Sequence, residues 1–222
     1  MEGKFNTRDD AINQISNEIK ERFSGEGTGH DWWHIYRVWR MSRNLASQYD
    51  EADDLVIELA ALTHDMADHK LMEKPEEGEK ELQELLKRHE VLDEDINHVL
   101  YISRNISFKG ANVEEQMSTL EGKIVQDADR LDAIGAIGIA RTFAYGGSKK
   151  HELYNPEIPV EQHDNFEAYK SSKAPTINHF YEKLLLLKDR LNTEAARKIA
   201  EERHRYMEEF LERFYEEWEG KR

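Results

Sequence analysis

The sequence has no cysteine among its 222 residues and only four prolines. The absence of cysteine excludes disulfide bonds, thiolate metal sites and thiol nucleophiles, and fits a reducing compartment. No run of apolar residues is long enough to span a bilayer as a helix. The N-terminus, residues 1–10, is polar and charged and lacks the apolar core of a signal peptide. These absences predict a cytoplasmic protein that does not enter a membrane.

Basic residues are also in deficit, with 31 Lys and Arg against 46 Asp and Glu, which gives a net charge of -15. Such an acidic chain disfavours long nucleic acid as a partner. Local charge can still bind a small anion, although any single basic residue is more often a solvated surface charge. The basic residues that accompany the polar motifs are Arg37, Arg40, Arg104, Lys109 and Arg130. We therefore expect a small phosphorylated substrate.

Apolar residues recur at helical spacing along most of the chain. The first predicted helix presents Ile12, Ile15, Ile19 and Phe23 on one face. Further helices are predicted over 31–49, 76–88, 93–105, 119–129, 132–145, 176–190 and 193–218. One more is predicted between 31–49 and 76–88, capped by Asp53 or Asp54 and ending at the pair His64-Asp65. The stretches 119–129 and 132–145 are two separate helices or one kinked helix, which Gly146 and Gly147 end. Residues 148–174 are predicted to be a long loop, either a cover over the site or disordered. With no convincing strand, repeat or linker, the sequence predicts an all-α fold in a single domain.

The adjacent pair His64-Asp65 closes the apolar stretch 55–63. Polar residues at the inward end of an apolar helix need a partner. His34 lies in another predicted helix, next to two tryptophans. A lone histidine of this kind more often has a hydrogen-bonded core role than a ligand role, but the His-Asp pair shifts the balance towards a metal site.

A second carboxylate comes from the acidic cluster at 127–132. Asp129 lies in an apolar context, and Asp127 and Asp132 are rival candidates; helical geometry puts Asp129 and Asp132 on one face. The alternative for all three is a helix cap or a salt bridge with Arg130. Two imidazoles and two carboxylates can hold a divalent cation with open positions, and such an ion can activate water and bind phosphate oxygens. This set of residues predicts a hydrolase.

Four blocks of sequence resemble the HD superfamily of metal-dependent phosphohydrolases, an all-helical fold named for its His-Asp pair. One bacterial subgroup is especially similar, and the blocks are GHDWWH at 29–34, LTHD at 62–65, ISFKG at 106–110 and QDADRLDAIG at 126–135. The resemblance covers about 12–218. The resemblance implies a single HD-type domain over 1–222 with a helical bundle as its core. It also implies that the metal ligands are His34, His64, Asp65 and Asp129.

One divalent metal is expected rather than two, because the extra histidines of some superfamily branches have no counterpart. The remaining histidines in charged or loop contexts are expected at the surface, namely His89, His98, His151, His163 and His204. Two imidazoles favour the softer divalent cations. Manganese is the preferred metal, and magnesium, iron, cobalt and nickel stay open.

The remaining site residues are assigned roles in catalysis and substrate binding. Asp68 lies close to one turn after His64 and is expected to accept a proton from the attacking water, a role that the resemblance supports. The equal alternative is that Asp68 caps the start of a loop. His30, one turn before His34, is expected to orient that residue or touch substrate. The cations expected to neutralise phosphoryl charge are Arg37, Arg104, Lys109 and Arg130.

The leading functional expectation is cleavage of a nucleoside triphosphate to monophosphate and pyrophosphate. A 5′-nucleotidase or other small-phosphoester hydrolase comes second, with alarmone or cyclic nucleotides as a third substrate class. A non-catalytic metal- or nucleotide-binding sensor module is the contrasting alternative. The last predicted helix carries an aromatic stripe that is expected to pack in the core, with a homodimer contact as the alternative; its residues are Ile199, Phe210, Leu211, Phe214 and Trp218.

Overall fold

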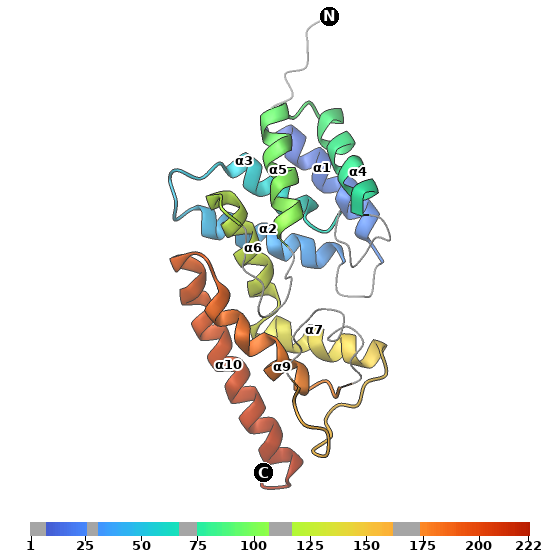
Figure 1. The fold of residues 1–222 in the computed structure, drawn as a ribbon, viewed down its shortest axis with the longest axis vertical. Helices are drawn as coiled ribbons and strands as arrows, with labels where there is room; N and C mark the ends of the chain where they lie inside the picture. The colour runs from blue at the N-terminus through green and yellow to red at the C-terminus, as the bar shows by residue number, and fades with distance from the viewer. Residues whose placement is uncertain (1–7, 26–30, 67–74, 107–116, 162–173) are drawn as a thin grey trace, which may run out of the picture. The chain divides into compact units, whose positions relative to one another are not determined.

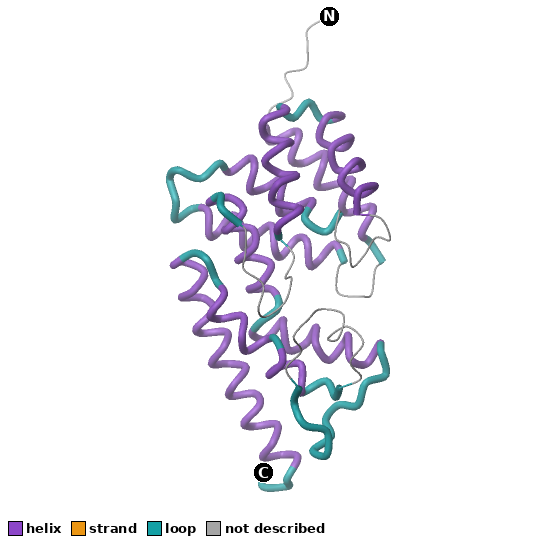
Figure 2. Tube along the Cα trace, in the orientation of Figure 1, coloured by secondary structure: helices purple, strands orange, loops and turns teal. Residues whose placement is uncertain are grey.

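The computed structural model describes residues 8–25, 31–66, 75–106, 117–161 and 174–222. These residues form helices and connecting segments and contain no strand, so the all-α prediction is confirmed (Figure 2). None of the helices in these ranges is long and apolar enough to cross a membrane. The chain divides into two compact units, one formed by residues 1–108 and 115–128 and the other by 109–114 and 129–222. The single-domain organisation stays a prediction.

The first unit holds the helices that carry the His-Asp pair and its neighbours (Figure 1). In chain order they are α1 (Arg8–Phe23), α2 (Trp32–Ala46), α3 (Asp54–Thr63), α4 (Pro75–Arg88), α5 (Asp93–Asn105) and most of α6 (Leu120–Asp132). The predicted inner face of α1 is confirmed, because the side chains at its four predicted positions are all buried. The predicted bounds of α5 also match the structure.

Helix α3 forms the centre of the first unit. It packs against α1, α2 and α5, and from Val56 onwards every residue except Glu58 is buried. Asp53 caps its start by accepting hydrogen bonds from the backbone N–H groups of Leu55 and Val56. Glu58 is half-buried and accepts a hydrogen bond from the Trp39 indole at 2.9 Å. A helix that is apolar on nearly all sides is stable only when neighbours surround it, so the end of α3 lies inside the unit.

His89 is buried, and the prediction that it is a surface residue is wrong. It follows α4, and its ring lies against α1. The Nε2 atom is 2.5 Å from Oε1 of Glu18, and Nδ1 is 3.2 Å from Oε1 of Gln14. Arg88 contacts the other oxygen of Glu18 at 2.5 Å. The charged sequence around His89 therefore reflects polar contacts between two helices rather than exposure to solvent.

The second unit contains the end of α6 and the helices that follow it. These are α7 (Gly135–Ser148), α9 (Asn178–Glu182), the 3-10 helix η1 (Leu184–Arg190) and α10 (Glu194–Trp218). Of the two alternatives for 119–145, two separate helices are confirmed and one kinked helix is wrong. Ile134, with φ -124° and ψ 165°, is extended, and Gly135 has a φ of +75°. The helix predicted over 176–190 is likewise interrupted at Lys183.

Gly146 and Gly147 lie inside α7, which continues to Ser148, so the prediction that they end the helix is wrong. A Cβ atom at Gly146 would collide with the side chain of Thr176, whereas one at Gly147 would meet nothing within 4 Å. Gly146 is therefore needed for the close approach of the segment around Thr176 and not for ending the helix.

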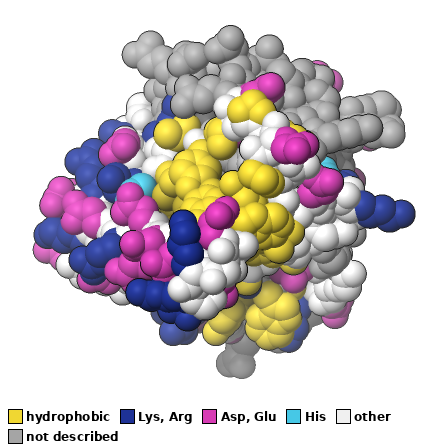
Figure 3. All heavy atoms as spheres, turned by 90° about the horizontal axis from the view of Figure 1, so that it is seen from below, with side chains coloured by type: hydrophobic (Ala, Val, Ile, Leu, Met, Phe, Trp, Pro, Cys, Tyr) yellow, Lys and Arg dark blue, Asp and Glu magenta, His cyan; other side chains and the backbone are white. Residues whose placement is uncertain are grey.

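The predicted long loop covers 148–174. Ser148 belongs to α7, residues 149–161 and Ala174 have neither helix nor strand, and 162–173 lie outside the described residues. Tyr154 of this segment packs on the end of α10, with ring centroids 5.9, 5.3 and 5.0 Å from those of Phe214, Tyr215 and Trp218. Trp218 keeps 46% of its surface exposed. Figure 3 shows hydrophobic side chains gathered among charged ones on the face seen from below. The homodimer contact stays a prediction.

The two adjacent glycines of α7 provide a matched pair of substitutions. We expect Gly146→Ala to lower the free energy of unfolding by about 1–3 kcal/mol, because the new methyl group forces Thr176 aside. Gly147→Ala should raise it by about 0.5 kcal/mol, because alanine restricts the unfolded chain and meets no neighbour. Urea unfolding of both variants measures the difference, and equal effects would contradict the role given to Thr176.

His179 on α9 makes the stability of the second unit dependent on pH. Burial, with a smaller contribution from the charge of Lys183, lowers the pKa of His179 to about 3. In the unfolded chain the group has a pKa of about 6.5 and takes up a proton earlier as the pH falls. Its contribution to stability is therefore complete above about pH 6.5 and is lost towards pH 3.

From pH 8 to pH 5 we expect this effect to cost the wild type about 1–2 kcal/mol more than His179→Gln, which carries no titrating group. Urea unfolding of both proteins at the two pH values measures the difference. Parallel losses in the two proteins would mean that His179 titrates alike in the folded and unfolded states.

Candidate metal centre

His34 belongs to the first turn of α2 and is 1% exposed. Asp31 caps this helix, and its carboxylate accepts a hydrogen bond from the backbone N–H of His34 at 2.9 Å. An aspartate cap fixes where a helix begins. The cap therefore fixes the turn from which the imidazole projects.

His64 and Asp65 follow α3 directly and are 4% and 3% exposed. His64 still has helical dihedral angles, with φ -57° and ψ -32°. A further backbone hydrogen bond, from Met66 to the carbonyl of Thr63 at 2.9 Å, closes a turn after the helix. Both polar side chains are thus held at the inner end of the apolar helix, where the sequence predicts that they need a partner.

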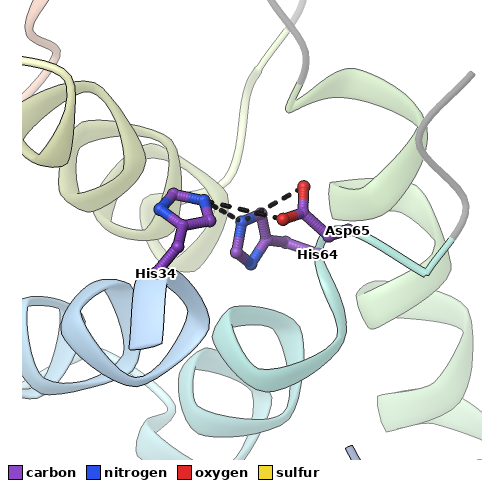
Figure 4. Close-up of side chains that lie close together, drawn as sticks. All are labelled: His34, His64 and Asp65. Atoms are coloured by element: carbon purple, nitrogen blue, oxygen red, sulfur yellow. Dashed lines mark hydrogen bonds and ion pairs between the residues drawn. The ribbon is translucent and has the colours of Figure 1, made fainter. Parts of the chain in front are cut away.

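The side chains of His34, His64 and Asp65 point towards one another from α2 and from the end of α3 (Figure 4). The two Nε2 atoms are 3.1 Å apart. The carboxylate oxygens of Asp65 lie 3.6 Å from Nε2 of His34 and 3.5 Å from Nε2 of His64. One ligand atom from each residue lies within 4.8 Å of the others. The first three predicted metal ligands are therefore brought together.

The protonation of the His64 ring is set within its own helix. Its Nδ1 atom lies 2.8 Å from the carbonyl oxygen of Ala61. A carbonyl can only accept, so Nδ1 carries the hydrogen and Nε2 presents a lone pair to the cluster. Contacts of this kind orient metal-bound histidines. The sequence reasoning missed Ala61, because a backbone acceptor leaves no trace in the residue type.

These three residues fit a divalent cation. The distances from the carboxylate oxygens to the imidazole nitrogens exceed ordinary hydrogen-bond lengths of about 2.7–3.2 Å, and the three side chains face a shared point. Two nitrogen ligands about 2.1 Å from an ion and at right angles would be about 3.0 Å apart, close to the separation of the two Nε2 atoms. Burying a carboxylate beside neutral imidazoles is costly unless a positive charge accompanies it.

The three aspartates near the end of α6 have different surroundings. Asp127 is fully buried and belongs to the first unit. Asp132 is 5% exposed, and its Oδ2 accepts a hydrogen bond from Arg141 at 2.7 Å. Asp129 is half-buried and belongs to the second unit. The ion pair of Asp132 favours Asp129 over Asp132 as the fourth ligand, a role that stays a prediction.

The predicted cations lie in different environments. Arg37 is half-buried on α2, three residues after His34. Arg104 is exposed on α5, and two of its nitrogens donate to Glu79 at 2.9 and 2.8 Å, a contact that raises the pKa of the guanidinium. Arg130 is buried and donates to the carbonyl of Arg190. The predicted residues that lie outside the described ranges are His30, Asp68 and Lys109.

The sequence and the fold match known proteins along most of the chain. Residues 32–134 match the family model described as HD domain. YpgQ from Bacillus subtilis (strain 168) is 40% identical over 200 residues, which are 89% of each chain. The crystal structure of a Bacillus thuringiensis HD-superfamily hydrolase is 45% identical, with a TM-score of 0.77 over 96% of this chain and 99% of that one. The structure of Bacillus subtilis YpgQ in complex with ADP is 34% identical, with a TM-score of 0.76 over 95% and 96% of the two chains.

An all-α fold with buried histidines and an aspartate at the His-Asp pair defines the class as a hydrolase with a site that can hold a metal. The chain belongs to the HD superfamily. The predicted resemblance to this superfamily is thereby confirmed.

Removal of one donor should abolish metal binding without unfolding the chain. We expect His64→Ala to weaken Mn²⁺ binding by more than about 100-fold, because loss of an outer partner of a ligand alone costs about 10–100-fold. His204→Ala is the control, since His204 contacts Glu208 on α10. Free Mn²⁺ measured by electron paramagnetic resonance gives the affinity, and circular dichroism gives the helical content. Wild-type affinity in a folded His64→Ala protein would remove this residue from the site.

Proposed function

We propose that this protein hydrolyses nucleoside triphosphates to the monophosphate and pyrophosphate. The observation that carries the proposal is the complex of Bacillus subtilis YpgQ with ADP, a relative whose structure matches 95% of this chain. A nucleotide with linked phosphates is thus a ligand of a close relative, and the superfamily is one of hydrolases. The cluster of His34, His64 and Asp65 supports a reaction at phosphorus.

The charges of the proposed ligand set suit an anionic substrate. His34 and His64 are neutral donors in this set, and Asp65 and Asp129 together contribute two negative charges. When bound, a divalent cation balances these charges, polarises a phosphoryl oxygen and lowers the pKa of a coordinated water. We propose manganese as this cation, because two imidazoles favour it over magnesium.

The chain's own residues hold the donors and exclude water. The three clustered side chains are buried, and charge–charge interactions are stronger where bulk water is excluded. The Ala61 carbonyl keeps the Nε2 lone pair of His64 directed at the cluster. We assign Asp68 as the base that accepts the proton of the attacking water.

Substrate binding requires positive charge near the phosphates. Arg37 is the preferred cation, because it lies on the same helix as His34. Lys109 and His30 keep their proposed roles as a second cation and as a substrate contact. Arg104 and Arg130 would each have to exchange a contact, with Glu79 and with the Arg190 carbonyl, before they could reach a phosphate.

A product assay tests the proposal. Metal-stripped protein with Mn²⁺ restored is given nucleoside mono-, di- and triphosphates, with separate detection of phosphate and pyrophosphate. We expect pyrophosphate from triphosphates, at least about 100-fold slower in Asp65→Asn, which loses a ligand charge. Asp68→Asn should keep Mn²⁺ affinity and lose rate by about 100-fold, because it removes only the base.

Other products would change the assignment. Phosphate released from monophosphates alone would indicate a 5′-nucleotidase. No product from any nucleotide, with Mn²⁺ bound, would favour a sensor module or another phosphoester as substrate. Equal rates for the wild type and Asp65→Asn would identify a contaminating activity.

A further inference from the structure

The last turn of α6 is held by two arginines from other helices of the second unit. Arg203 of α10 donates from Nη1 to the carbonyl oxygen of Leu131. Arg141 of α7 donates from Nη1 to Oδ2 of Asp132 at 2.7 Å and to its carbonyl oxygen at 3.4 Å. Helices α7 and α10 pack on each other, so both arginines come from one packed pair.

These contacts satisfy a general need of a helix end. The last four carbonyl groups of an α-helix have no partner within the helix, and cations are favoured beside them. Asp129 to Asp132 are the last four residues of α6. The carbonyls of Leu131 and Asp132 receive the two guanidinium groups, so α6 keeps its helical form up to the residue where it ends.

Gly135 makes room for this arrangement. Its φ of +75° is a conformation that L side chains rarely adopt. A Cβ atom at this position would lie 2.9 Å from Cγ and 3.0 Å from Cβ of Arg203. The glycine therefore permits both the turn between α6 and α7 and the approach of Arg203 to Leu131. The end of the block QDADRLDAIG thus has a physical explanation in the packing of α10.

The guanidinium group of Arg203 is partly removed from water, which costs free energy for a charged group. Burial lowers the pKa of Arg203, against a smaller opposite effect from the nearby carboxylate of Asp132. A guanidinium is favourable in such a place only when its donors are used. The carbonyl of Leu131 and the charge of Asp132 supply that compensation.

We infer that Arg203 and Arg141 are positioning residues for Asp129. The inference rests on the proposed function, in which Asp129 is the fourth metal ligand. Asp129 is the first residue of the turn whose carbonyls the arginines hold. If that turn frays, the Asp129 carboxylate samples more orientations and pays more entropy on binding a cation. The arginines therefore act on metal affinity without contacting the metal.

The test compares Mn²⁺ affinities of full-length variants. Arg203→Met keeps the aliphatic bulk against Gly135 and removes the donors, and we expect it to weaken Mn²⁺ binding by about 10-fold or more. Arg203→Lys keeps a cation and should recover part of the affinity. Arg213→Met is the matched control, because Arg213 of the same helix donates to Glu217 on α10 itself; it should bind Mn²⁺ as the wild type does.

Two results would overturn the inference: wild-type Mn²⁺ affinity in folded Arg203→Met, or an equal loss in Arg213→Met. If Arg203→Met does not fold, the Mn²⁺ affinities of Arg203→Lys and Arg141→Lys are measured instead. Wild-type affinity in both folded variants would overturn the inference. Asp129→Asn separates the two proposals. A loss of affinity in Asp129→Asn without one in Arg203→Met refutes only the positioning role, whereas unchanged affinity in Asp129→Asn refutes the ligand assignment and the positioning role together.

Discussion

The burial of helix α3 is the constraint on which the candidate site depends. Its apolar sequence forces α1, α2 and α5 to surround it. His64 and Asp65 come directly after α3, and the backbone of His64 is still helical. The packing that buries α3 therefore also places these two polar residues in the interior. The cost of burying them is offset by one another, by His34 and by the Ala61 carbonyl. A cluster that could hold a metal ion is thus a direct result of placing polar residues at the end of a core helix.

The two units use charge in different ways. In the first, one carboxylate and two imidazoles face a shared point. In the second, the guanidinium groups of Arg203 and Arg141 donate to helix carbonyls and to Asp132. Cationic groups committed in this way stabilise the backbone. The number of basic residues near a motif is therefore a poor guide to which of them bind phosphate.

Local sequence patterns predicted much of this architecture. Helical periodicity located α1 and α5 and the buried face of α1, and the His-Asp pair with His34 identified the clustered donors. The sequence-based predictions were wrong where the structure depends on contacts between residues that are far apart in the chain. Only Thr176 explains why Gly146 lies within a helix, and only Arg203 explains the turn at Gly135. The burial of His89 likewise depends on α1 and not on its own neighbours in sequence.

The three clustered donors come from two consecutive helices, and only thirty residues separate His34 from His64. Contacts between such near neighbours in sequence have a low entropic cost of loop closure and form early in folding. During synthesis the chain emerges N-terminus first. The donors can therefore meet while the residues of the second unit are still being added, and a cation held by them would already stabilise the packing of α2 against α3 in the growing chain.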